Sequence, residues 1–154
     1  MGVAYTWLDT LTLEPIKGEP IQDNVGQLFQ YAGERLGSGF EHRGTLSLGY
    51  AVGGFTASWR TYYQSAMVDT LGIPETDPDY LAISDYWYHD AQVRYAFGED
   101  ETVSVYLGVD NVFDKQPPLV DQNKAGWFPG TETAAGSYDA IGRFVYAGVQ
   151  LKIQ

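Results

Sequence analysis

The feature that most constrains this chain is a two-residue alternation of apolar and polar side chains, repeated in several long runs. In the run 43–52, Leu46 and Leu48 share one face, while Thr45 and Ser47 share the other. Successive side chains of a β-strand point to opposite faces of the sheet, so this period predicts strands with one apolar face. The same alternation is found in the runs 3–7, 55–64, 87–97, 103–110 and 144–153. The sequence therefore predicts an all-β fold with about six antiparallel strands.

The lengths of the runs, and of the links between them, separate two all-β architectures. Strands of soluble proteins average about 5 to 6 residues, whereas a tilted strand that crosses a membrane needs about 9 to 11. Four of the runs reach about 10 residues, the length of a membrane strand. The links 53–54 and 98–101 are tight, and the links 10–41, 66–86 and 114–140 are long. Because outer-membrane barrels have short periplasmic turns and long extracellular loops, we predict an antiparallel transmembrane β-barrel segment.

Aromatic and acidic residues fit the same orientation. Aromatic residues of the apolar face lie near its two ends, as interfacial girdles do: Tyr50, Phe55, Tyr95 and Phe97 at one end, Tyr63 and Trp87 at the other. Of the 20 acidic residues, 15 lie between residues 9 and 41, 69 and 85, or 114 and 139, in the predicted outer loops. The net charge of −11 argues against nucleic-acid binding through a basic patch.

The polar face of the predicted strands carries nearly all of their charges, and we expect it to face the barrel lumen. The residues predicted to face the lumen are Arg60, Asp90, Arg94, Tyr106 and Asp110. In an incomplete sheet these polar groups would lack partners, and burying them unpaired would be costly.

Residue types that carry catalysis or bind metals are sparse. The chain has no cysteine, and its two histidines, His42 and His89, lie on different predicted strands. A histidine-based triad or metal site is therefore not predicted, and we expect neither an enzyme nor a cofactor. In the last long link, Trp127 and Phe128 are suited to stack on a ligand. Packing of that loop on itself as a compact unit explains them equally well.

Three stretches resemble TonB-dependent outer-membrane receptors. The stretch 107–118, LGVDNVFDKQPP, resembles the end of that family's penultimate strand. The stretch 137–144, SYDAIGRF, resembles the start of its last strand, and 42–50, HRGTLSLGY, is similar to an earlier strand. The resemblance implies that residues 1–154 are the C-terminal part of the barrel, its last strands out of about 22. It also implies that the plug domain is not included, which would explain why no signal peptide is visible.

The resemblance further implies a function and partners. Members of this family sit in the bacterial outer membrane and take up scarce nutrients such as siderophore-bound iron, a cobalamin-like cofactor or a glycan. The energy comes from an inner-membrane complex through TonB, which acts on the plug. The expected partners are the rest of the barrel, the plug, outer-membrane lipid and the barrel-assembly machinery. The lumen-facing residues would contact the plug or line the path of the solute.

The C-terminal run resembles a barrel-assembly signal in which a glycine precedes alternating apolar residues. Gly148, Leu151 and Ile153 match its spacing, although the terminal aromatic residue is missing. Alternatively, this run is an ordinary amphipathic strand in which Gly148 relieves crowding in the lumen.

Two other classes of protein share the alternation. One is a soluble all-β carbohydrate-binding module with an aromatic platform, since soluble sheets also have one apolar face. The other is a small outer-membrane barrel that closes by self-assembly. Strand length and the aromatic residues near the strand ends argue against the first. The long outer loops permit the second, but the family-like motifs near the C-terminus favour the receptor.

Overall fold

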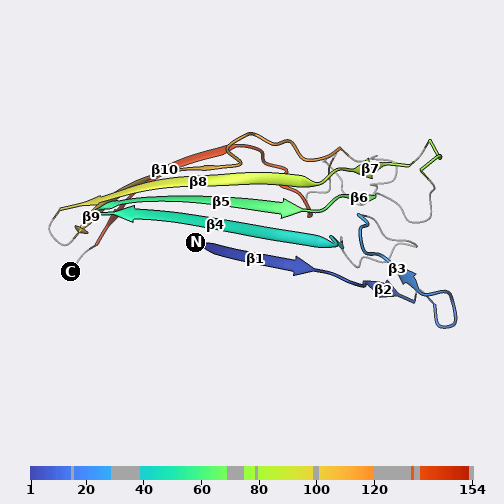
Figure 1. Ribbon diagram of the computed structural model, residues 1–154. Coiled ribbons are helices and arrows are strands. Elements are labelled where there is room, and N and C mark those ends of the chain that lie inside the picture. Colours follow the sequence, from blue (N-terminus) through green and yellow to red (C-terminus); the bar gives the residue numbers. More distant parts are fainter. Residues whose placement is uncertain are drawn as a thin grey trace.

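A computed structural model describes residues 1–14, 16–28, 39–68, 75–78, 80–98, 101–119, 133 and 136–152. Six long strands form one antiparallel sheet (Figure 1). They are β1 (Gly2–Trp7), β4 (His42–Val52), β5 (Phe55–Gln64), β8 (Tyr86–Phe97), β9 (Val103–Asp110) and β10 (Phe144–Leu151). Each of the six predicted runs is therefore confirmed as a strand. The described part of the chain has no helix long and apolar enough to cross a membrane.

The six strands follow one another across the sheet as a meander, in the order β1-β4-β5-β8-β9-β10. The β4–β5 turn is closed by Gly53, whose φ of 53° is a left-handed conformation that suits glycine. The turn from β8 to β9 begins at Gly98, with a φ of 89°. Both tight turns lie at one end of the sheet, and the long links lie at the other (Figure 1). We call these the turn end and the loop end.

Within the described parts of the long links lie four short strands, which the sequence did not predict. β2 (Thr12–Leu13) pairs with β3 (Gln22–Asp23), and β6 (Met67–Val68) pairs with β7 (Ala82–Ile83). Each pair forms a separate two-stranded sheet at the loop end (Figure 1). A strand of two residues is too short to show a period of two, which is why the alternation gave no sign of them.

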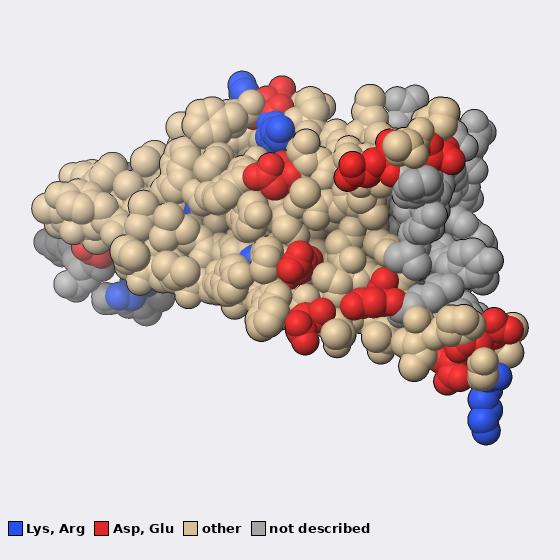
Figure 2. All heavy atoms as spheres, turned by 45° about the vertical axis from the view of Figure 1, so that its right-hand side comes forward, with Lys and Arg blue, Asp and Glu red and all other residues tan. Residues whose placement is uncertain are grey.

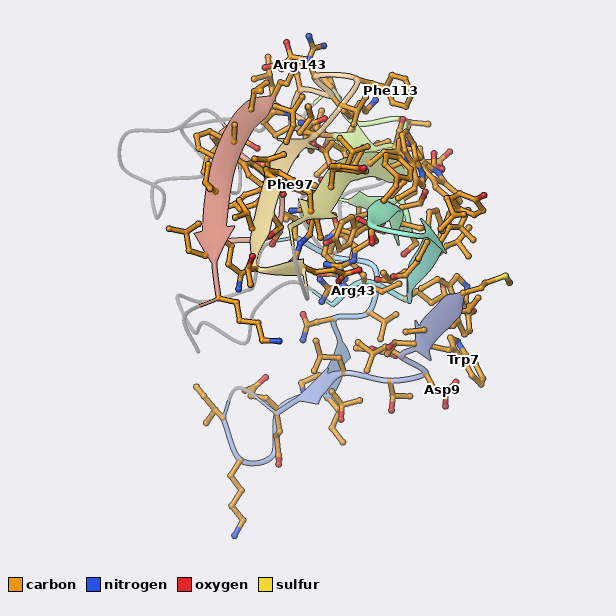
Figure 3. All side chains as sticks on the ribbon, turned by 90° about the vertical axis from the view of Figure 1, so that its left-hand side faces the viewer. Trp7, Asp9, Arg43, Phe97, Phe113 and Arg143 are labelled. Atoms are coloured by element: carbon orange, nitrogen blue, oxygen red, sulfur yellow. The ribbon has the colours of Figure 1, made fainter. Side chains whose placement is uncertain are left out.

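The register of the sheet keeps the two predicted faces apart across all six strands. Leu48 lies opposite Trp59, and Trp59 lies opposite Ala91, so apolar residues continue from strand to strand. On the other face, Arg60 lies between Ser47 and Asp90. Viewed end-on, the strands form an arc with Arg43 on its concave side and Trp7 and Phe113 on its convex side (Figure 3). The concave face is therefore the polar one.

The apolar, convex face is exposed rather than covered by protein. Val3 is 68% exposed, Tyr50 63% and Val149 66%. A soluble sandwich would bury such residues against a second sheet, because apolar surface is stabilised by removal from water. The described residues supply no such cover, which argues against the soluble module and is the arrangement expected of a lipid-facing wall.

Buried apolar side chains of the chain pack together at the loop end, in a cluster that we call the outer core. Its members are Leu28, Phe40, Met67, Ile83, Tyr86 and Tyr138, each at most 5% exposed. The ring of Tyr138 meets Phe40 edge-on at a centroid distance of 5.7 Å and Tyr86 at 5.3 Å. Because these residues come from all three long links and the start of β8, the bases of the links fold together as one unit.

The sheet is an open arc. Among the described strands, β1 pairs only with β4, and β10 pairs only with β9. One edge of each strand therefore presents backbone N–H and C=O groups that a further strand can pair with.

Candidate functional site

A concavity of about 240 Å³ lies on the polar face near the middle of β5 and β8. It brings together three of the residues predicted to face the lumen, Arg60, Asp90 and Asp110. The remaining polar groups that line it are Ser47, Ser58, Gln92 and Tyr146. The concavity therefore offers a cation, carboxylates, an amide and hydroxyl groups to whatever occupies the concave side.

Arg60 is held against aromatic side chains toward the loop end. Its Nη1 donates a hydrogen bond to the Tyr62 hydroxyl at 3.2 Å, and its Cζ lies 6.0 Å from the centroid of that ring. Tyr62 in turn stacks on Tyr88 of the neighbouring strand, with ring centroids 4.3 Å apart. The stack limits the positions open to Tyr62 and so orients the guanidinium of Arg60.

Asp90 is fixed by the turn that follows β9. Its Oδ1 accepts a hydrogen bond of 3.0 Å from the backbone N–H of Asn111. The Asn111 side chain is 1% exposed; it accepts from the N–H of Lys115 at 2.8 Å and donates to its carbonyl at 2.9 Å. Asn111 has a φ of 53°, a left-handed conformation that asparagine adopts more readily than most residues. The Asp-Asn-Val-Phe-Asp stretch thus closes a turn that positions a polar-face carboxylate.

The same turn also packs on the convex face. The ring of Phe113 lies 5.3 Å from His89 and 6.2 Å from Trp59. His89 Nδ1 lies 2.9 Å from the Thr61 hydroxyl, to which the Trp59 indole N–H also donates at 3.0 Å. His89 therefore packs in the wall, on the side of the sheet opposite Asp90.

Arg94 and Tyr106, the other two predicted lumen residues, lie nearer the turn end and directly opposite each other. Arg94 lines a second concavity of about 290 Å³ together with Thr56, Gln92 and Glu101. Tyr106 instead projects toward β10, where its ring tip lies over Gly148. The five predicted residues thus share one face of the sheet but do not form one site.

Sequence reasoning did not single out Gln92 and Tyr146. The Gln92 side-chain amide donates to the Tyr146 hydroxyl at 3.2 Å, linking β8 to β10 across the intervening β9. The alternation places both residues on the polar face. Their contact depends on the pairing of both residues with Gly108, which only the register reveals.

Several predicted residues cannot be compared with the structure. Trp127, Phe128 and Ile153 lie outside the described residues. Gly148 and Leu151 lie in β10, where both have the strand geometry that either interpretation of the C-terminal run requires.

Electrostatics differ between the loop end and the sheet. Of the described acidic side chains, most gather toward the loop end (Figure 2). There, backbone N–H groups of Leu11 and Val25 hydrogen-bond to Asp23 and lower the pKa of its carboxyl group. Burial raises the pKa of Tyr138 to about 12, and the neighbouring Tyr86 adds to that shift. No group of three or more His, Cys, Asp or Glu side chains in the described residues could hold a metal ion.

Comparison with known proteins adds to this geometry. The β-barrel family described as TonB-dependent receptor-like matches residues 1–112. The chain belongs to the TonB-dependent receptor family. Neither the curated proteins nor the solved structures gave a match.

Membership of the TonB-dependent receptor family confirms the sequence resemblance and the antiparallel β-barrel fold class. The matched region takes in β1 to β9 and ends at Val112, inside the Asp-Asn-Val-Phe-Asp stretch. The last long link and β10 lie beyond it. Proteins of this family are transporters rather than enzymes and are typically found in the bacterial outer membrane.

Proposed function

We propose that this chain forms part of the wall of an active-transport receptor in the bacterial outer membrane. The receptor takes up a scarce nutrient, which is siderophore-bound iron, a cobalamin-like cofactor or a glycan. The family match over residues 1–112 is the observation that carries this proposal. Energy reaches the receptor from the inner membrane through TonB and the plug, and the solute is not chemically altered.

The segregation of the two faces supports this role. The convex face exposes apolar residues to contact lipid, whereas the concave face presents Arg60, Asp90 and Asp110 around a concavity. In the assembled receptor these polar groups contact the plug or line the path of the solute. Arg94 and Tyr106 do the same nearer the turn end. Trp127 and Phe128 remain predicted ligand contacts of the last long link.

The open edges of β1 and β10 support a larger assembly. We propose that residues 1–154 form the C-terminal part of the barrel and that further strands of the same receptor pair with both edges. Single-chain outer-membrane barrels have at least about 8 strands, more than the six-stranded sheet seen here. Gly148, Leu151 and Ile153 are the residues that the barrel-assembly machinery would recognise. The same edges also permit closure by self-assembly, which is the second candidate.

Uptake measurements test the proposal directly. A strain that lacks this chain is grown with iron-siderophore complexes, cobalamin or oligosaccharides as the limiting nutrient, beside the parent and a complemented strain. We expect loss of growth on one of the three nutrient classes, and the same loss in a parent strain without TonB. Normal growth of the deletion strain on all three classes would contradict the proposal.

Variants of the polar face show whether uptake depends on the concavity. Arg60→Ala and Asp90→Asn should reduce uptake several-fold while the amount of folded receptor stays unchanged, because an asparagine at position 90 keeps an oxygen that accepts from the N–H of Asn111. Val93→Ala, on the convex face of the same strand as Asp90, is the matched control and should leave uptake intact. Equal effects of all three substitutions would mean that the polar face has no special part in transport.

A further inference from the structure

Tyr146 crosses a neighbouring strand at a glycine. It lies directly opposite Gly108 of β9, and Gly108 lies directly opposite Gln92 of β8. A Cβ at position 108 would collide with Cζ and the hydroxyl oxygen of Tyr146, so the tip of the ring occupies the space above the glycine. The hydroxyl then accepts a hydrogen bond from Gln92 Nε2 at 3.2 Å. Because Gly108 has no side chain, Tyr146 of β10 can extend across β9 and reach β8. We call such a glycine, with the ring tip above it, a socket.

Tyr106 repeats this arrangement in the opposite direction. It lies opposite Gly148 of β10, and a Cβ at position 148 would collide with Cζ and the hydroxyl oxygen of Tyr106. The two rings pass each other at a centroid distance of 6.3 Å. The hydroxyl of Tyr106 therefore lies over β10, just as the hydroxyl of Tyr146 lies over β9.

Beyond Gly148 lies the unpaired edge of β10. No described strand there supplies a side chain that could bond to Tyr106 as Gln92 does to Tyr146. Within the described residues, the Tyr106 hydroxyl makes no hydrogen bond like that between Tyr146 and Gln92. We propose that this edge binds an antiparallel strand of the receptor, with a polar side chain facing the concave side opposite Gly148 that hydrogen-bonds to the Tyr106 hydroxyl. This strand is not one of the six described here.

The chemistry of the partner follows from the position of the hydroxyl. Tyr106 lies on the concave face and is half-buried in the described sheet. A strand that pairs with β10 would cover its hydroxyl further, and a buried hydroxyl without a partner is destabilising. An amide, hydroxyl or carboxylate side chain can bond to it, as Gln92 does to Tyr146, whereas an apolar side chain cannot. Gly148 is then needed because a side chain there would displace the ring from the edge. This inference rests on the proposed function, in which the chain is part of a larger receptor barrel, and it does not depend on which solute is transported.

A double-mutant cycle tests the socket. The variants G148A, Y106A and G148A/Y106A are made in the full chain within its receptor. Unfolding by urea in dodecylmaltoside micelles is followed by the different gel mobility of folded and unfolded barrels. The tip of the ring can swing aside, so G148A should weaken folding less than Y106A, which also removes the contact of the ring with Tyr146. The double variant should then be no weaker than Y106A, because both changes abolish the contact between the ring and Gly148.

The matched cycle G108A, Y146A and G108A/Y146A calibrates the method, because there both partners of the tyrosine are visible. If the effects of G148A and Y106A add in full while the control pair is coupled, the proposed contact between the Tyr106 ring and Gly148 does not contribute to folding.

The hydroxyl group is tested separately, because Y106F keeps the ring over Gly148. We expect Y106F to lower the folding equilibrium constant about five-fold, the change that corresponds to one ordinary hydrogen bond. Y146F and Q92L, alone and combined, are the controls; each should give a similar loss, and the pair should not add. If Y146F is weakened and Y106F is not, the proposed hydrogen bond to the neighbouring strand does not exist.

Photo-cross-linking identifies the strand. With p-benzoylphenylalanine in place of Tyr146, the cross-linked peptide should come from β8. In place of Tyr106, it should come from a strand outside the six, at a residue on the concave face. A cross-link to β1 of a second copy, for example at Thr6, would overturn the assignment to another strand of the receptor and show self-assembly instead.

Discussion

The apolar side chains of the loop end and of the sheet wall are covered in different ways. In the outer core, apolar side chains such as Phe40 and Tyr86 are almost completely buried by other parts of the chain. In the wall, side chains of the same types, such as Tyr50 and Phe97, remain 63% and 44% exposed. The outer core is packed like the interior of a soluble protein, whereas the apolar surface of the wall is left for lipid to cover. The stability of the first should depend on protein contacts, and that of the second on the membrane.

The largest effect is expected from emptying the outer core. Phe40→Ala should destabilise the loop end by about 3–5 kcal/mol, the usual range for removal of a buried aromatic ring. Because protein surrounds this ring, the loss should be the same in detergents of different chain length. Urea unfolding in two such detergents, with tryptophan fluorescence as the readout, measures it.

Phe97→Ala is the matched control in the wall, and its cost should change with the detergent. If the cost of Phe40→Ala also varied with the detergent, the outer core would not be shielded from the membrane as the burial indicates.

A charge placed on the convex face should have the next largest effect. Leu107 is 49% exposed near the middle of β9, and Leu107→Arg should cost about 2–4 kcal/mol in lipid vesicles, as arginine does at the bilayer midplane. Ser58→Arg places the same side chain on the polar face and should cost much less. Equal losses for the two variants, measured by urea titration, would show that the convex face does not contact lipid.

The smallest effect concerns pH and the buried hydroxyl of Tyr138. Its pKa is raised from 10.0 to about 12, so the folded state favours the neutral phenol. The corresponding stability is fully present below pH 10 and is lost as the pH rises through the folded pKa. Tyr138→Phe should flatten this part of the pH profile of loop-end unfolding and cost little at neutral pH. A profile unchanged by Tyr138→Phe would assign the alkaline loss to another group.

Much of the sheet was predictable because its signal is local. Alternation over about 10 residues identifies a strand and its two faces without knowledge of any partner, and all six strands and both tight turns were found in this way. The shared face of Arg60, Asp90 and Arg94 follows from the same parity. The Asp-Asn-Val-Phe-Asp stretch was recognisable as a motif, but its hydrogen bond to Asp90 was not, because that contact joins two different strands.

By itself, then, the sequence determined the strands, their faces, the distinction between tight turns and long links, and the family. Tertiary structure decided the outer core, which joins residues as far apart in the chain as Leu28 and Tyr138. It also decided that Tyr106 meets Gly148 and Tyr146 meets Gly108. The physical reason is that side-chain direction in a strand repeats every two residues and can be followed along one segment. Register and loop packing, in contrast, depend on which segments meet in space.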